Sequence, residues 1–309
     1  MSPAARVTSS ASAWTQLREL ASDIKLSHSI FALPWALLAT FLAAGEWHRD
    51  ARSQPHFPGQ LALIVLCMVT ARTVAMSVNR LLDAKLDATN PRTARRAIPA
   101  GRLSMRFGWM TAGTCGCCFI LATSLFGFAY QNWLPLILSA PVLLFISAYP
   151  LLKRFTGLCH FYLGACLALA PVCAWVAIAG NISLTPLIMA AAVLCWTAGF
   201  DIIYACQDYE SDLRTGVFSV PARLGITGGL HVARATHLAC ITLLIALAVY
   251  VPQFQWLFAL AIAIAGVLLL VEHLLVKPND LSKVNLAFFT LNGVISLVIG
   301  ALGVADIYL

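Results

Sequence analysis

Long apolar segments separated by shorter polar ones dominate the chain. A helix needs ~20 mostly apolar residues to cross a hydrocarbon core, and the segments lack the alternation of a membrane β-barrel. Lipid cannot satisfy open strand edges, so helices are the expected form. The pattern predicts an all-α, polytopic membrane bundle of nine transmembrane helices, at roughly 29–45, 61–82, 107–129, 133–149, 158–179, 184–206, 236–251, 254–276 and 284–304.

The composition agrees with this pattern. Of the 309 residues, 60% are hydrophobic and only 11% are charged, whereas soluble domains carry about 25% charged residues. A soluble globular protein is therefore excluded, and the lipid bilayer is the expected surrounding. The 10 cysteines are scattered through the apolar segments without zinc-site spacing, so we interpret them as small apolar residues.

The distribution of positive charge predicts the orientation in the membrane. Most of the 20 lysine and arginine residues lie in alternate loops, whereas the opposite loops hold only Arg49 and Arg52. By the positive-inside rule, the N-terminus is cytosolic and the C-terminus lies outside, in a bacterial inner membrane. The net charge of +7 then reflects topology and phosphate handling, and no nucleic-acid partner is expected.

The N-terminal stretch has no apolar segment before residue 29, so we expect no cleavable signal peptide. Residues 1–27 are predicted to form a cytosolic or interfacial arm. No linker divides the remainder, so residues 28–309 are predicted to form one transmembrane domain.

Two acidic motifs end apolar segments. NRLLDAKLD (79–87) places Asn79, Asp83 and Asp87 at four-residue steps, and DIIYACQDYESD (201–212) repeats the spacing. Residues four apart lie on one face of an α-helix. The repetition indicates two pseudo-equivalent acidic helix ends that face one cavity on the cytosolic side, the second built from Asp201, Tyr204, Asp208 and Asp212.

Stacked carboxylates repel one another unless they share a cation. Mg²⁺ suits such a site because it binds a few carboxylates and leaves positions for substrate phosphate. The alternative is that these are ordinary solvated residues at helix ends. Two motifs of matching spacing among only 13 acidic residues favour a metal site that holds a diphosphate.

Basic residues accompany the motifs. Arg72 lies within an apolar segment, where charge is costly, and seven residues before Asn79, so it faces the same side. The run NPRTARRAIPAGR (90–102) supplies Arg92 and Arg96, and a third segment supplies Lys153 and Arg154. Arginine forks suit phosphate oxygens, although each of these residues also satisfies the positive-inside rule.

A diphosphate site beside a hydrophobic bundle indicates a substrate with a charged head and a long apolar tail. Metal ions neutralise a departing diphosphate, and a dry cavity protects the resulting allylic cation until an electron-rich ring attacks it. An ion-coupled transporter is the alternative from another class, and it predicts isolated charges near the bilayer midplane.

The motifs resemble those of the UbiA superfamily of intramembrane prenyltransferases. NRLLDAKLDATNPRTARRAIPAG is similar to the first family signature, DIIYACQDYESD to the second, and AYPLLKRFT (148–156) to the YPxxKR loop. Arg72 matches the arginine that precedes the family's asparagine by seven residues. The likeness runs from about residue 25 to 304, and its one departure is Asn90-Pro91, where Val or Met often precedes the arginine.

The resemblance implies Mg²⁺-dependent transfer of a polyprenyl group from polyprenyl diphosphate to an aromatic acid in ubiquinone or menaquinone biosynthesis. It implies metal binding by Asp83, Asp87, Asp208 and Asp212, and further catalytic roles for Asp201 and Arg72. The residues it implies for substrate binding are Asn79, Arg92, Arg96, Tyr149, Lys153, Arg154 and Tyr204.

The resemblance also bears on the acceptor. The NPRTA wording and IKLSHSIFALPWA (24–36) resemble a bacterial subgroup of 4-hydroxybenzoate polyprenyltransferases. Related members act on a dihydroxynaphthoate in the futalosine route to menaquinone. 4-Hydroxybenzoate is the favoured acceptor, and 1,4-dihydroxy-6-naphthoate is the alternative.

Overall fold

The computed structural model describes residues 13–23, 31–47 and 56–309, and within these ranges the chain is built from helices and turns. The helices are α1 (Ala13–Asp23), α2 (Leu33–Trp47), α3 (Phe57–Thr89), α4 (Met105–Tyr130), α5 (Leu134–Leu152), α6 (Cys159–Ala179), α7 (Leu184–Ala205), α8 (Tyr209–Thr215), α9 (Val220–Tyr250), α10 (Trp256–Leu275), α11 (Val284–Leu286) and α12 (Asn292–Asp306). A 3₁₀ turn, η3 (Cys206–Asp208), joins α7 to α8, and a π-helical turn, η4 (Ala287–Leu291), joins α11 to α12.

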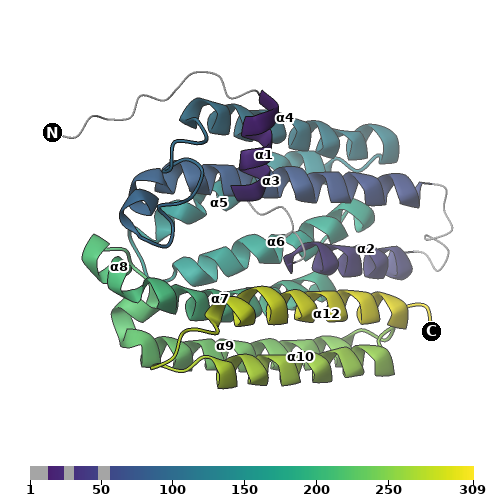
Figure 1. The fold of residues 1–309 in the computed structure, drawn as a ribbon. Helices are drawn as coiled ribbons and strands as arrows, with labels where there is room; N and C mark the ends of the chain where they lie inside the picture. The colour runs from purple at the N-terminus through teal and green to yellow at the C-terminus, as the bar shows by residue number, and fades with distance from the viewer. Residues whose placement is uncertain (1–12, 24–30, 48–55) are drawn as a thin grey trace.

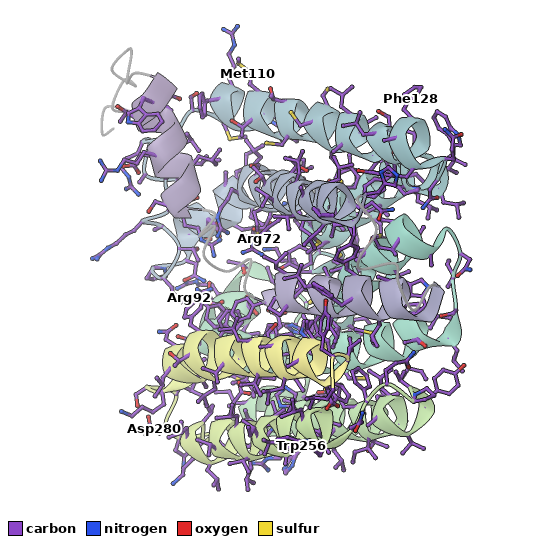
Figure 2. The ribbon with its side chains drawn as sticks, turned by 90° about the vertical axis from the view of Figure 1, so that its right-hand side faces the viewer. Arg72, Arg92, Met110, Phe128, Trp256 and Asp280 are labelled. Atoms are coloured by element: carbon purple, nitrogen blue, oxygen red, sulfur yellow. The ribbon has the colours of Figure 1, made fainter. Side chains whose placement is uncertain are left out.

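Eight helical segments in the described ranges are long and apolar enough to cross a membrane. Outward-facing side chains such as Met110, Phe128 and Trp256 are apolar and exposed, as a lipid-facing surface requires (Figure 2). The chain is therefore an integral membrane protein with an all-α fold. The first predicted span, 29–45, corresponds to α2, whose 15 residues fall short of a full crossing. Residues 24–30, which include the predicted start of this span, lie outside the described ranges.

The predicted spans leave two long polar stretches between them, 83–106 and 207–234, and the second is largely helical where a loop was expected. The stretch 207–234 forms α8 and the first half of α9. Ser219 caps α9 by accepting a hydrogen bond from the Ala222 backbone N–H (3.2 Å), and Pro221 occupies the first turn, where its missing N–H costs nothing. Gly225, at φ 71° and ψ 167°, allows the kink that lets the helix continue.

The other expected loop, 83–106, begins as helix because α3 continues to Thr89. It ends there because Pro91 disfavours helical geometry at Asn90, whose φ and ψ are −98° and 118°. Turns then fill 90–104, and Gly101 takes a left-handed φ of 73° that suits glycine. The first acidic motif is therefore helical to its last residue, as predicted.

The helices pack in two groups on either side of α6 and α2 (Figure 1). α3, α4 and α5 lie on one side, and α7, α9, α10 and α12 lie on the other. A buried apolar core that includes Trp35, Trp175, Trp196 and Phe258 joins α2, α6, α7 and α10. α1 packs against the turns of 90–104, because Leu20 is buried with Ala97 and Leu103. These turns and α8 lie at one end of the bundle, and the C-terminus lies at the other (Figure 1). Both acidic motifs therefore reach the same end.

Close contact between α6 and α7 depends on Gly164, because a Cβ there would lie 2.5 Å from the Leu194 carbonyl oxygen. We expect Gly164→Ala to destabilise the bundle by about 1–3 kcal/mol, since backbone cannot move aside as a side chain can. The matched control is Gly113→Ala on α4, where nothing lies within 4 Å of the added carbon. Thermal unfolding in detergent should show a lower midpoint for the first variant only; equal midpoints would contradict the packing.

Candidate active site

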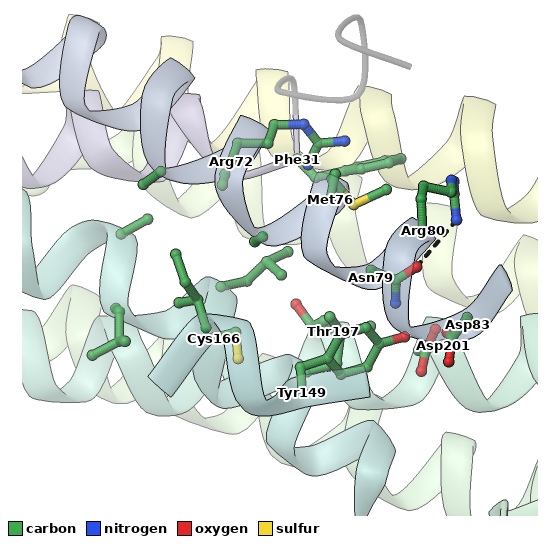
Figure 3. Close-up of a pocket in the computed structure, with 18 of the residues that line it drawn as sticks. Phe31, Arg72, Met76, Asn79, Arg80, Asp83, Tyr149, Cys166, Thr197 and Asp201 are labelled. Atoms are coloured by element: carbon green, nitrogen blue, oxygen red, sulfur yellow. Dashed lines mark hydrogen bonds between the residues drawn. The ribbon is translucent and has the colours of Figure 1, made fainter. Parts of the chain in front are cut away.

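A cavity of about 690 Å³ opens between the two groups of helices at the end where the acidic motifs lie (Figure 3). Every predicted site residue except Arg154 lines it: Arg72, Asn79, Asp83, Asp87, Arg92, Arg96, Tyr149, Lys153, Asp201, Tyr204, Asp208 and Asp212. Residues far apart in the sequence therefore share one space.

The first acidic motif is buried against basic partners. The Asp83 side chain is 1% exposed and accepts a hydrogen bond from Lys153 Nζ at 2.5 Å. Both carboxylate oxygens of Asp87 accept from Arg96 Nη1 at 2.7 Å. Lys153 and Arg96 are 22% and 24% exposed, so each base covers a deeper carboxylate from the side of the opening.

The second acidic motif does not follow one continuous α-helix, contrary to the expected four-residue face. η3 winds the backbone more tightly between α7 and α8 and so turns Asp208 away from the position that an α-helix would give it. Asp208 accepts from Arg92 Nε (2.8 Å) and Nη2 (2.5 Å) and from Asn90 Nδ2 (2.8 Å). Asp212 accepts from the Ser219 hydroxyl at 2.8 Å.

Arg92 joins the two motifs. It follows the first motif in sequence, yet its guanidinium forks onto Asp208 of the second and donates to the Tyr204 hydroxyl at 2.7 Å. Burial lowers the pKa of Arg92, but the hydrogen bonds and charge of Asp208 outweigh burial and raise that pKa. Arg92 is therefore held in its charged form by its contacts with Asp208.

The Lys153 segment is tied to the second motif through backbone contacts. The Phe218 N–H donates to the Lys153 carbonyl at 2.7 Å, and the Cys159 thiol donates to the Phe218 carbonyl at 3.3 Å. These contacts fix the position of Lys153, which covers Asp83, relative to Ser219, which donates a hydrogen bond to Asp212.

Arg154 lies beside the cavity and does not line it. Its Nη2 donates to the Leu82 carbonyl at 2.7 Å and stays 3.8 Å from Asp83 Oδ1, with its side chain 40% exposed. The adjacent residues Lys153 and Arg154 therefore differ in their access to the site.

The residues present fit a magnesium ion in their donor chemistry. Their carboxylate oxygens are the hard ligands that Mg²⁺ prefers, and the buried Asp83 Oδ1 has no hydrogen-bond partner within the described ranges. In the described ranges, no three His, Cys, Asp or Glu side chains converge on a common point, because the four carboxylates face the bases and the serine named above. A metal ion would have to replace those partners.

Arg72 lies on α3 seven residues before Asn79, and its side chain extends beside Phe31 (Figures 2 and 3). It lines the cavity, and its Nε is buried without a hydrogen-bond partner in the described part of the chain. The apolar portion of the cavity surrounds it, lined by residues such as Ile64, Phe119, Phe126, Val142, Leu163 and Leu167. One space thus offers both a charged end and an apolar pocket.

Four further residues at the site were not predicted from the sequence: His160, Arg80, Asn90 and Ser219. His160 Nδ1 lies 2.7 Å from Asp201 Oδ2, but 41 residues separate them and no spacing rule connects them. Arg80 was interpreted only as a loop charge, although it is buried and donates to the Asn79 side chain at 3.1 Å. Asn90 and Ser219 could have been identified from the sequence. Asn90 immediately precedes Pro91, and Ser219 immediately precedes the start of α9.

Helix α1 is fastened beside the cavity opening. Asp23 lies 3.3 Å from Arg80 Nε, with both side chains 9% exposed, and it accepts from the Ala97 backbone N–H at 3.1 Å. Glu19 pairs with Arg102 at 2.9 Å in a more exposed position. Glu19 and Asp23 also line the cavity, so α1 forms part of its wall.

Residues 32–294 match the UbiA prenyltransferase family. The chain belongs to this family. It is a prenyltransferase, and the clustering of its acids with bases at one end of the bundle differs from the isolated midplane charges that a transporter would need.

Named relatives and solved structures resemble the chain over most of its length. The 4-hydroxybenzoate octaprenyltransferase of Methylococcus capsulatus is 29% identical over 265 residues, which cover 84% of each chain. The apo structure of a UbiA homologue from Aeropyrum pernix K1 superposes with a TM-score of 0.79 at 29% identity, over 91% of this chain and 98% of that one. A UbiA homologue from Archaeoglobus fulgidus, solved with GPP and Mg²⁺, has the same fold at 18% identity, with a TM-score of 0.68 over 94% and 100% of the two chains.

The Asp23 contacts predict how α1 is held. Asp23→Ala removes the partner of a buried arginine and the acceptor of the Ala97 N–H, so we expect α1 to detach more often. Trypsin cleavage at Arg18 should accelerate about tenfold, since cleavage follows the population of the open form. Glu19→Ala, which breaks the more exposed pair, is the control and should accelerate cleavage much less. Equal rates for Asp23→Ala and the parent would refute this attachment.

Proposed function

We propose that this UbiA-family enzyme transfers a polyprenyl group from polyprenyl diphosphate to an aromatic acid, with 4-hydroxybenzoate as the favoured acceptor. The observation that carries the proposal is one cavity lined by both acidic motifs, their bases and an apolar pocket. The names of the relatives favour 4-hydroxybenzoate, and the Archaeoglobus fulgidus structure with GPP and Mg²⁺ supports a diphosphate donor and a divalent metal.

The charged end of the cavity is the proposed diphosphate site. Asp83, Asp87, Asp208 and Asp212 would hold Mg²⁺, which neutralises the diphosphate as it leaves. Arg92, Arg96 and Lys153 now cover three of these carboxylates. On donor binding they would exchange carboxylate for phosphate oxygens, which arginine forks match equally well. Asn79 would complete the oxygen ligands from the same helix face.

The apolar part of the cavity would take the proximal prenyl units and exclude water from the reacting carbon. The bond between the first prenyl carbon and the diphosphate oxygen breaks, and its electron pair leaves with the diphosphate. A ring carbon beside the acceptor hydroxyl then bonds to the allylic cation, and loss of the proton from that carbon restores the aromatic ring. Tyr204 and Tyr149 would face the cation and the acceptor from opposite sides.

Arg72 and Asp201 are the proposed acceptor residues. The guanidinium of Arg72, whose Nε has no hydrogen-bond partner among the described residues, would bind the acceptor carboxylate, and Asp201 would accept a hydrogen bond from the acceptor hydroxyl. The site end of the bundle would face the cytosol, as the positive-inside rule predicts, which gives access to water-soluble aromatic acids.

The test of this function uses the purified chain in lipid nanodiscs with Mg²⁺ and a polyprenyl diphosphate. 4-Hydroxybenzoate and 1,4-dihydroxy-6-naphthoate are supplied in parallel, and products are identified by mass. We expect prenylated 4-hydroxybenzoate. Asp83→Asn and Asp208→Asn should each lower turnover by roughly 10²–10³-fold, because charge stabilisation of the leaving group is lost. Unchanged turnover in either folded variant would contradict the metal assignment, and product only from the naphthoate would replace the acceptor.

Arg72 should act on the acceptor alone. Arg72→Gln keeps hydrogen-bonding capacity but removes the charge, and we expect the acceptor KM to rise roughly 10–100-fold while the donor KM stays near that of the parent. Arg106→Gln, at an exposed basic position on α4 outside the cavity, is the control and should leave both constants unchanged. A rise in donor KM instead would assign Arg72 to the diphosphate.

A further inference from the structure

We propose that His160 is a positioning residue that fixes Asp201 as a hydrogen-bond acceptor for the hydroxyl of the aromatic acid. This inference rests on the proposed function and deepens it, because it states which chemical group of the acceptor the cavity selects. It starts from a histidine at the first turn of α6, which is 3% exposed and lines the cavity.

The surroundings of His160 determine its protonation. The Val220 backbone N–H points to Nε2 at 3.2 Å, and a backbone amide can only donate. An Nε2 that accepts this hydrogen bond carries the lone pair of a neutral ring. In the neutral ring the proton then lies on Nδ1, so Nδ1–H donates to Asp201 Oδ2 at 2.7 Å.

This tautomer determines how the carboxylate of Asp201 is hydrogen bonded. A neutral donor leaves the carboxylate its full negative charge, whereas an imidazolium would neutralise it. Oδ2 is occupied by His160, and Oδ1 has no hydrogen-bond partner among the described residues. The Asp201 side chain is 17% exposed and the His160 side chain 4%, so the ring stands behind the carboxylate and the carboxylate faces the cavity.

An oriented carboxylate with one free oxygen selects its ligand. It accepts a hydrogen bond from a hydroxyl and repels a carboxylate. An aromatic acid must therefore turn its hydroxyl toward Asp201 and its carboxyl group away, toward the distant guanidinium of Arg72 in the same cavity (Figure 3). Asp201 thus gives the acceptor one orientation, and His160 keeps Asp201 in place.

His160 also joins this acceptor region to the diphosphate region. Val220, its hydrogen-bond donor, follows Ser219, which holds Asp212. Cys159, its neighbour, donates to the Phe218 carbonyl. The start of α6 and the start of α9 are therefore fastened together at the point where both substrates meet.

The experiment compares His160→Leu, which loses both hydrogen bonds, with His160→Gln, whose amide can donate to Asp201 and accept from Val220. We expect His160→Leu to lower kcat/KM for 4-hydroxybenzoate roughly tenfold or more, and His160→Gln to restore most of the loss. Binding of a non-reactive prenyl thiolodiphosphate with Mg²⁺ should stay within about twofold of the parent in both. His237→Gln is the control, because His237 is also buried in a helix but pairs with His273 and does not line the cavity.

A general loss of packing would not change two further readouts: the selectivity between acceptors and the coupling between His160 and Asp201 in a double mutant. In the parent, 4-hydroxybenzoate should bind the acceptor site more tightly than benzoate in a competition assay. His160→Leu should reduce the ratio of these two affinities. In an Asp201→Asn background, His160→Leu should cost little more, because both act through one hydrogen bond. Additive losses, an unchanged ratio, or no rescue by folded His160→Gln would overturn the proposal.

One further measurement does not depend on turnover. Solid-state NMR of the ¹⁵N-histidine-labelled parent, with His160→Gln used for assignment, should show a protonated Nδ1 and an unprotonated Nε2 for His160. A protonated Nε2 would overturn the proposal. If the parent transfers no prenyl group to any aromatic acid, the proposed function fails, while the NMR result still judges the tautomer.

Discussion

The site depends on carboxylates being held in the end of an apolar bundle, where an uncompensated charge is costly. Asp83, at 1% exposure, is the most extreme case, and Lys153 reaches across from another helix to meet it. Arg96 and Arg92 do the same for Asp87 and Asp208. The turns of 90–104 and the loop after α5 are shaped by this requirement, since each must bring a base to a specific acid.

The same pairing explains why the motifs converge from three distant parts of the chain. Arg92 crosses from the first motif to the second, and the backbone contact between Phe218 and Lys153 joins the third to the second. Because Lys153 and Arg92 each pair with an acid from another motif, no single motif forms the site alone. Their exposed positions also leave the bases free to exchange partners when phosphate arrives.

Sequence alone predicted the elements governed by local rules. The apolar lengths of α3 to α7, the four-residue face of Asn79, Asp83 and Asp87, and the depth of Arg72 all follow from helix periodicity and lipid chemistry. The prediction was wrong where a cap or a special backbone conformation decided the outcome. Ser219 and Gly225 turned an expected polar loop into the start of α9, and η3 interrupted the second acidic face. The contact between His160 and Asp201 was out of reach, because only the packing of α6 against α7 brings them together.

The volume of the cavity has a consequence for how the enzyme meets its donor. About 690 Å³ is the size of a pocket for a drug-sized molecule, so a long polyprenyl tail, if the proposed donor carries one, would not be enclosed in it. The distal part of such a tail would remain among the acyl chains while its diphosphate head reacts. The effective concentration of donor is then its mole fraction in the bilayer, and a longer tail adds affinity for the membrane without adding contacts to the protein.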